Sequence, residues 1–219
     1  MKQSLKKIDK KDACPTCLRP KDQCFCSTVI PAHTSLRVLI LQHPQEQYKL
    51  LNSARLAHAA LDNSVMRVGL SWRNFAHALG EEANPKEWGV LYLKSGGETD
   101  KPVEFFDSKK RKAERAPRLK GLIAIDGSWK QAKALWWRNP WLLRLNRISL
   151  NMQKQSLRPQ MKSEGLSTIE ALACALDVLG EKHSVGELLV RQYADLVIQP
   201  SALYRPTGTP NGPVVVTKE

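Results

Sequence analysis

The chain has 219 residues, of which 42% are hydrophobic, so it is long enough for one well-buried core with a small appendage. This composition excludes wholesale disorder, and no apolar run approaches the roughly 20 residues needed to cross a bilayer. The charged N-terminal segment lacks the apolar stretch of a signal peptide, so we expect a cytoplasmic protein.

The net charge of +13 indicates a partner of opposite charge, and RNA or DNA is the commonest such polyanion. A membrane-surface protein is the alternative, but no Lys/Arg-rich amphipathic helix supports it. Residues 127–163 contain eight Lys and Arg but no Asp or Glu. A second basic cluster, at 109–112, is equally well explained as a solvated face. We therefore expect contacts with nucleic acid mainly within 127–163.

Four of the five cysteines lie close together near the N-terminus, as Cys14, Cys17, Cys24 and Cys26. Two close pairs can supply four thiolates to one tetrahedral Zn²⁺. Disulfides would suit a secreted protein, and a redox CxxC would leave the second pair idle. We therefore predict a structural zinc motif at 12–30, which braces the N-terminus or touches the nucleic acid. Cys174 lies in an apolar helical stretch and is most simply a small core residue.

In the first half of the chain, short apolar runs alternate with helical patterns. Runs rich in branched residues predict strands at 36–41, 65–68 and 88–93. Pro44 is well placed to start a helix that runs to residue 61. Ser71 is the expected N-cap of a helix that ends near Gly80.

The second half begins with a long connection at 95–117, rich in Gly, Lys and Glu, which we expect to be mobile. The elements expected after it are strand 119–125, helix 128–137, strand 147–150, helix 167–179, helix 185–197 and an extended tail. Ser167 and Glu170 form the sequence pattern of a capping box, which predicts that the helix 167–179 begins at Ser167.

Strands separated by helices predict an α/β fold with a mostly parallel sheet and helices on both faces. In such a sheet, ligands bind beyond the C-terminal ends of the strands. Gln42, His43, Asp126 and the loop before Ser167 all fall at those ends or in adjoining loops. A binding site is therefore expected where these segments meet.

The run Asp126-Gly127-Ser128-Trp129 is the strongest candidate for an active-site turn. Asp126 ends a predicted strand, and Gly127 lets a ligand approach the backbone closely. Ser128 then acts as the cap of the following helix, and Trp129 offers a flat face on which a base can stack. The alternative interpretation is structural, with Asp126 as a capping residue and Trp129 as a core filler.

Several short segments, taken together and in order, resemble the DTW-domain family, whose name comes from an Asp-x-Thr-Trp motif. The matching segments are 126–133, 41–46, 52–54, 157–159 and 165–171. The four-cysteine cluster is typical of bacterial members. This sequence carries Ser128 where the family usually has Thr, which keeps the hydroxyl and the capping ability. We expect this departure to tune activity without abolishing it.

The resemblance implies a tRNA-uridine aminocarboxypropyltransferase. Members of the family move the 3-amino-3-carboxypropyl group of S-adenosylmethionine to N3 of a uridine in tRNA and release methylthioadenosine. The implied fold is SPOUT-like, related to the knotted α/β folds of that class, with the cofactor held by loops near the C-terminal part of the sheet.

Given that reaction, the residues take on expected roles. The catalytic candidates are Asp126, Ser128 and Trp129, with Asp126 orienting or accepting the N3 proton. The candidates for the cofactor site are Gln42, His43, Gly127, Leu157, Leu166, Ser167 and Thr168. The candidates for phosphate contacts are Lys130, Lys133, Arg147 and Arg158. For His43, a structural role is equally well supported.

The expected organisation is the zinc motif at 12–30, a catalytic domain at 31–205 and an extended tail at 206–219. The expected partners are tRNA and S-adenosylmethionine, with no membrane and no obligate protein partner. Two other functions stay open. One is an RNA methyltransferase on the same scaffold, and the other is a zinc-containing RNA-binding protein without catalysis.

Overall fold

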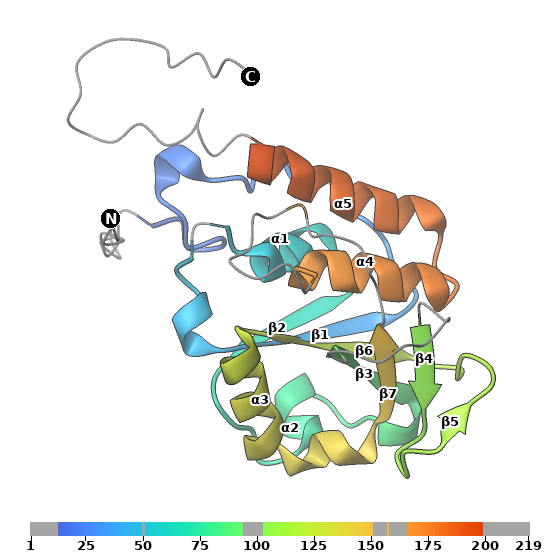
Figure 1. Cartoon of the computed structure of the whole chain (residues 1–219). Helices are drawn as coiled ribbons and strands as arrows, with labels where there is room; N and C mark the ends of the chain where they lie inside the picture. The colour runs from blue at the N-terminus through green and yellow to red at the C-terminus, as the bar shows by residue number, and fades with distance from the viewer. Residues whose placement is uncertain (1–12, 50, 94–102, 151–156, 158–165, 199–219) are drawn as a thin grey trace, which may run out of the picture.

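The computed structural model describes residues 13–49, 51–93, 103–150, 157 and 166–198. Within this part of the chain, seven strands form one sheet in the order β2-β1-β6-β3-β7-β4-β5 (Figure 1). The strands are β1 Arg37–Gln42, β2 Ser64–Val68, β3 Trp88–Leu93, β4 Val103–Phe106, β5 Lys112–Ala113, β6 Gly121–Asp126 and β7 Asn146–Leu150.

The helices of the described chain lie in two layers, one on each side of this sheet (Figure 1). The α-helices are α1 Ser53–Ala60, α2 Phe75–Leu79, α3 Trp129–Arg138, α4 Thr168–Val178 and α5 His183–Ile198. Short 3-10 helices are η1 Lys21–Gln23, η2 Pro44–Glu46, η3 Pro85–Glu87 and η4 Pro140–Arg144.

The five strands from β2 to β7 in the sheet order run parallel to one another. β4 pairs antiparallel with β7, and β5 pairs antiparallel with β4, so one edge of the sheet reverses direction. The predicted α/β architecture with a mostly parallel sheet is confirmed.

The apolar run of β1 shows why the sheet is covered on both faces. Val38 and Ile40 belong to one cluster of buried residues, with side chains of α1, α4 and α5. Leu39 and Leu41 belong to a second cluster, with Phe75 of α2 and side chains of η4. Because successive side chains of a strand point to opposite faces, a strand buried on both faces needs an unbroken apolar sequence.

The prediction that residues 95–117 form one long connection is wrong for the second half of this segment. β4 and β5 occupy 103–106 and 112–113 and extend the sheet at its edge. Lys112 of the edge strand β5 bridges the buried carboxylate of Glu104 in β4, so apolar periodicity in the sequence does not reveal this part of the sheet. Residues 95–102 lie outside the described part of the chain, as does the predicted tail at 206–219.

Two predicted helix starts are also wrong. α1 begins at Ser53 because the side chain of Asn52 accepts a hydrogen bond from Arg55 N, whereas Pro44 opens only the short η2. α2 begins at Phe75, capped by Asn74 and not by Ser71. Its predicted end is confirmed, since Gly80 takes the left-handed conformation with φ 94°.

No helix among the described residues has the length and apolar character needed to pass through a bilayer.

Candidate active site at the carboxyl end of the sheet

The site begins where β1 and β6 end side by side. Their register pairs the last residue of each strand, so Gln42 lies opposite Asp126. The backbone continues this pairing, since His43 N donates to Asp126 O at 2.9 Å. The sequence expectation that these two residues meet at the carboxyl edge is therefore confirmed.

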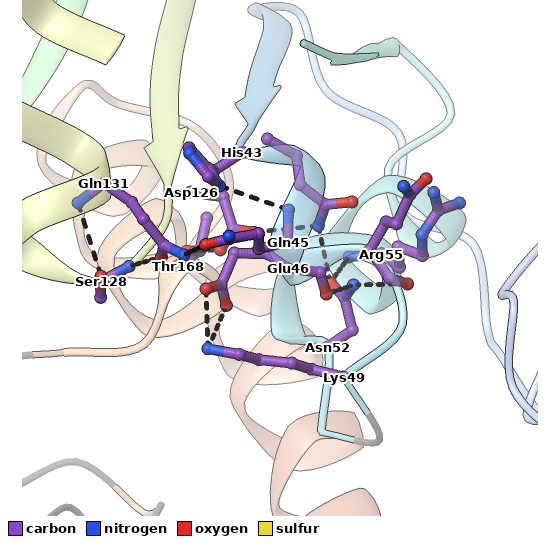
Figure 2. A network of polar contacts seen from close by, with 12 residues as sticks. His43, Gln45, Glu46, Lys49, Asn52, Arg55, Asp126, Ser128, Gln131 and Thr168 are labelled. Carbon is purple, nitrogen blue, oxygen red and sulfur yellow. Dashed lines mark hydrogen bonds and ion pairs between the residues drawn. The ribbon is translucent and has the colours of Figure 1, made fainter. Parts of the chain in front are cut away.

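The carboxylate of Asp126 is buried and bound at both oxygens (Figure 2). Gln42 Nε2 donates to Oδ2 at 2.9 Å, and the Thr168 hydroxyl at the start of α4 donates to Oδ1 at 2.6 Å. Three segments far apart in the sequence thus converge on one side chain. The Asp126 carboxylate accepts hydrogen bonds from the end of β1 and from the start of α4. Ser128, two residues after Asp126, caps α3.

Burial raises the pKa of Asp126 above its ordinary value. The hydrogen bonds from Thr168 and Gln42 act in the opposite direction, because both stabilise the charged form. Glu46 raises the pKa further and Lys49 lowers it. These last two side chains form an ion pair of 2.7 Å with each other, so their net field at Asp126 is small.

The amide of Gln42 is fixed by the residues on its other side. Asn52 donates through Nδ2 to the backbone oxygens of Glu46 and Gln47, so its Oδ1 must face Gln42. Gln42 Nε2 donates to that oxygen at 3.0 Å and to Asp126 as well. The remaining atom, Gln42 Oε1, is buried and has no partner among the described residues.

The turn into α3 is closed by a capping box, as the Ser128 prediction requires. Ser128 N donates to Gln131 Oε1 at 2.7 Å, and Gln131 N donates to Ser128 Oγ at 3.4 Å. Gln131 Nε2 then binds Gln45 Oε1 at 3.0 Å, which joins α3 to η2 (Figure 2). A Cβ at Gly127 would stand 2.9 Å from the Cβ of Gln131, so the close turn requires glycine.

His43 lies at the start of η2, where its Nδ1 accepts a hydrogen bond from Gln45 N at 3.3 Å. This contact gives the ring a capping role in the described structure. The expected contact with cofactor or RNA stays a prediction.

The predicted capping box at the start of α4 is confirmed and extends further than expected. The buried carboxylate of Glu170 accepts from Ser167 N at 2.8 Å and from Leu157 N at 2.7 Å. It therefore holds Leu157 next to the start of α4. Leu166 packs partly buried against the larger core cluster. Arg158 itself lies outside the described residues.

The basic and aromatic candidates lie on the outside of this network. Trp129 is 50% exposed, which excludes the alternative interpretation of it as a core filler. Lys130 and Lys133 are exposed on the same helix. Arg147 comes from β7, where its guanidinium lies 5.4 Å from the ring centre of Trp136.

Sequence reasoning assigned no site role to Asn52, Glu170 or Gln131. Asn52 lies in one of the segments that carry the family resemblance, and Glu170 completes a capping pattern, so both had a signal in the sequence. Gln131 and Gln45 also lie in such segments, but their pairing had no local signal, because it depends on α3 and η2 meeting in space.

The four N-terminal cysteines form a second site. Their sulfurs all lie within 4.8 Å of one another. Cys14 Sγ and Cys26 Sγ are 3.8 Å apart, and Cys17 Sγ and Cys24 Sγ are 3.7 Å apart. Four thiolates in a tetrahedron around Zn²⁺, with bonds of about 2.3 Å, have sulfurs about 3.8 Å apart. The cluster can therefore hold a metal ion.

Two arginines accompany the cysteine cluster. Arg19 is almost fully buried, and burial lowers its pKa while Cys17 and Cys24 raise it. A buried guanidinium beside thiolates offsets part of their negative charge. Arg55 of α1 donates from Nη1 to Thr16 O at 3.0 Å, and its own backbone N binds the Asn52 cap. Helix α1 thus links the cysteine cluster to the Asp126 network.

A family model described as the DTW domain matches residues 11–199, which is most of the chain. The chain belongs to the DTW-domain family. Among curated DTW-domain relatives, a Macaca fascicularis protein named tRNA-uridine aminocarboxypropyltransferase 2 is 30% identical over 186 residues, covering 81% of this chain. Proteins of the same name from Mus musculus and Drosophila melanogaster are each 29% identical, over 193 and 191 residues, and each match covers 84% of this chain.

This DTW-domain chain spans only part of those relatives, since the matches cover 60% of the Macaca protein, 61% of the Mus protein and 72% of the Drosophila protein. No solved structure matches the chain.

Proposed function

We propose that this protein is a tRNA-uridine aminocarboxypropyltransferase that uses S-adenosylmethionine as donor. The observation that carries the proposal is the network in which Gln42 and Thr168 converge on the buried Asp126, at the edge of the sheet where ligands of α/β folds bind. The name carried by the relatives in three organisms supplies the reaction class.

In the proposed reaction, N3 of a tRNA uridine attacks the carbon of the aminocarboxypropyl group that is attached to sulfur. The new N–C bond forms as the C–S bond breaks, the N3 proton leaves to a base or to water, and methylthioadenosine is released. The sulfonium is already an activated leaving group, so the protein's main task is to align the two reacting atoms.

We assign Asp126 a positioning role in this alignment. Its two oxygens are already bound, and only 9% of the residue is exposed, which favours organising its neighbours over direct approach to N3. Gln42 is fully buried, so we assign it a positioning role as well, in which its Nε2 holds the Asp126 carboxylate in place. The proton-accepting role expected of Asp126 from the sequence stays a prediction.

We further propose that the ligand site is lined by Ser128, Trp129, Gly127, His43, Leu157, Leu166 and Ser167. The phosphates of the RNA are contacted by Lys130, Lys133, Arg147 and Arg158. All of these side chains except Arg158 belong to the described segments around the Asp126 network or on the neighbouring α3 and β7. Three expectations stay predictions: the SPOUT-like fold, the division of the chain into 12–30 and 31–205, and the cytoplasmic location.

We propose that Cys14, Cys17, Cys24 and Cys26 hold a structural Zn²⁺. Sulfur separations of 3.7 and 3.8 Å suit tetrahedral coordination of one ion by four thiolates. Four protein ligands leave no open coordination position, so the ion would brace the fold without taking part in the transfer.

The test is a purified reaction with tRNA and S-adenosylmethionine labelled either in the carboxyl group or in the methyl group. The proposal expects label in tRNA only from the carboxyl-labelled donor. Label from the methyl group would make the protein a methyltransferase instead. Binding of tRNA without transfer from either donor would make it a binding protein.

A further inference from the structure

Helix α3 leaves two large aromatic rings in solvent beside the candidate active site. Trp137 is 67% exposed and Trp129 is 50% exposed, although Leu135 on the inner side of the same helix is fully buried. A tryptophan offers a large apolar area, so most of its surface is normally covered in a folded protein. Two such rings on one short helix therefore indicate a surface that something else covers.

The spacing of these residues places them in one row. Trp129, Lys133 and Trp137 follow one another at intervals of four residues, so each lies about 40° around the helix from the last. The row is about 12 Å long at 1.5 Å per residue, and Lys130 lies beside it. Aromatic rings thus alternate with ammonium groups along one exposed face.

The charge around this row has a single sign. Lys130, Lys133 and Arg138 are all exposed on α3, and residues 127–150 contain no Asp or Glu. A second copy of the same face would bring like charges together and be repelled, whereas a polyanion would be attracted. Charge complementarity therefore favours a nucleic acid as the occupant.

The aromatic and basic surface continues from α3 onto the sheet. Trp136 contacts Tyr92 of β3, with ring centres 5.6 Å apart, and Arg147 of β7 lies 5.4 Å from the same ring. Tyr92 is 46% exposed, and Arg147 Nε is buried without a partner among the described residues. The exposed ring of Tyr92 can therefore stack on a base of an RNA that follows the row, and Arg147 adds positive charge beside it.

We propose that this surface, called here the α3 strip and made of Trp129, Lys130, Lys133, Trp137, Tyr92 and Arg147, binds a single-stranded loop of the tRNA. Bases stack on the exposed rings, and the lysines and the arginine neutralise phosphates. Ser128, which caps the helix, adjoins Asp126, so the strip leads away from the candidate active site. The inference rests on the proposed function for the identity of the RNA. It gives a role to Trp137 and Tyr92, to which the sequence analysis assigned none.

The strip is tested by fluorescence anisotropy with unmodified tRNA and with a single-stranded oligoribonucleotide, both without S-adenosylmethionine. Trp137→Ala should weaken binding of the oligonucleotide by about fivefold to a hundredfold, the loss of one stacked base. Trp137→Phe should recover most of this affinity. Lys133→Ala should lower the slope of log affinity against log salt by about one unit or slightly less, whereas Trp137→Ala should leave that slope unchanged.

The matched control for charge is Lys182→Ala, which removes an exposed lysine between α4 and α5. Equal effects of Lys133→Ala and Lys182→Ala would overturn the proposal, since they would show non-specific attraction alone. Unchanged affinity in a folded Trp137→Ala variant would overturn it as well. The proposal would also be overturned if light scattering showed a wild-type dimer and Trp137→Ala converted it to a monomer without changing the RNA affinity.

Failure of the strip and failure of the proposed function give different results. If wild-type protein binds RNA through Trp137 but transfers no carboxyl label, the strip stands and the transferase assignment fails. If label is transferred and Trp137→Ala changes neither RNA affinity nor the KM for tRNA, the transferase assignment stands and the strip fails.

Discussion

Thr168, the first residue of α4, donates a 2.6 Å hydrogen bond to the buried carboxylate of Asp126 at the end of β6. This contact joins the second half of the chain to the strand edge where Gln42 binds the same carboxylate. A hydrogen bond to a charged and buried group contributes more than a neutral one, about 1.5–3 kcal/mol.

We predict that Thr168→Val lowers kcat/KM for aminocarboxypropyl transfer by at least about tenfold, because it removes the hydroxyl donor from the carboxylate. Thr168→Ser keeps the hydroxyl and should stay within a few-fold of the wild type. Steady-state kinetics of the two variants, with melting temperatures as a check on folding, give the comparison. Equal activity in the two variants would argue against a role for this contact.

The protonation of Asp126 should make the free energy of unfolding depend on pH. Its folded pKa is raised above the ordinary value of 3.8, so the folded state holds the proton more tightly than the unfolded state. The contribution of Asp126 is therefore most favourable below pH 3.8 and declines as the pH rises through the folded pKa. Between the two pKa values the slope approaches about −1.4 kcal/mol per pH unit.

Urea unfolding of the wild type and of Asp126→Asn, from pH 4 to pH 7, measures this linkage. The free energy of unfolding of the wild type should fall relative to that of the variant as the pH rises. A difference that is constant with pH, or that grows in favour of the wild type, would contradict a raised pKa.

The sequence predicted much of this site because strand ends and helix caps have local signals. The apolar run of β6 ends at Asp126, Ser128 and Ser167 cap the next helices, and the parallel sheet brings Gln42 to the same edge. It did not predict the Asn52 cap, since Pro44 gave an equally good local start for a helix.

Other features lacked any local signal. β4 lies next to the edge strand β5, and its buried Glu104 forms an ion pair with Lys112 of β5 eight residues later, so its pattern is not that of an apolar buried strand. The contact from Leu157 N to Glu170 likewise joins residues thirteen positions apart, through a capping pattern that otherwise indicates only a helix start.

Gln42 should contribute to binding of the donor indirectly, because its amide holds Asp126 at the edge of the sheet. We predict that Gln42→Met weakens the affinity for S-adenosylmethionine by about fivefold to a hundredfold, because the side chain keeps its length but loses the amide that binds Asp126 and Asn52. Gln192→Met on α5, where the amide binds the backbone of Ile30, is the matched control. Isothermal titration calorimetry measures both, and wild-type affinity in a folded Gln42→Met protein would refute the assignment.

Purified protein should carry one zinc ion per chain. Cys17→Ser should lose the metal and lower the melting temperature, because Cys17 is buried within the cluster and belongs to the larger core. Cys174→Ser, outside the cluster, should keep the metal. Elemental analysis with thermal unfolding checks both variants. Zinc retained in full by Cys17→Ser would speak against the four-cysteine site.

The chemical identity of the product distinguishes aminocarboxypropyl transfer from methyl transfer. After reaction with unmodified tRNA and S-adenosylmethionine, the tRNA is digested and its nucleosides are analysed by mass spectrometry. We predict a uridine whose base has gained one aminocarboxypropyl group, formed together with an equal amount of methylthioadenosine. A uridine that has gained only a methyl group, with S-adenosylhomocysteine as the second product, would contradict the account.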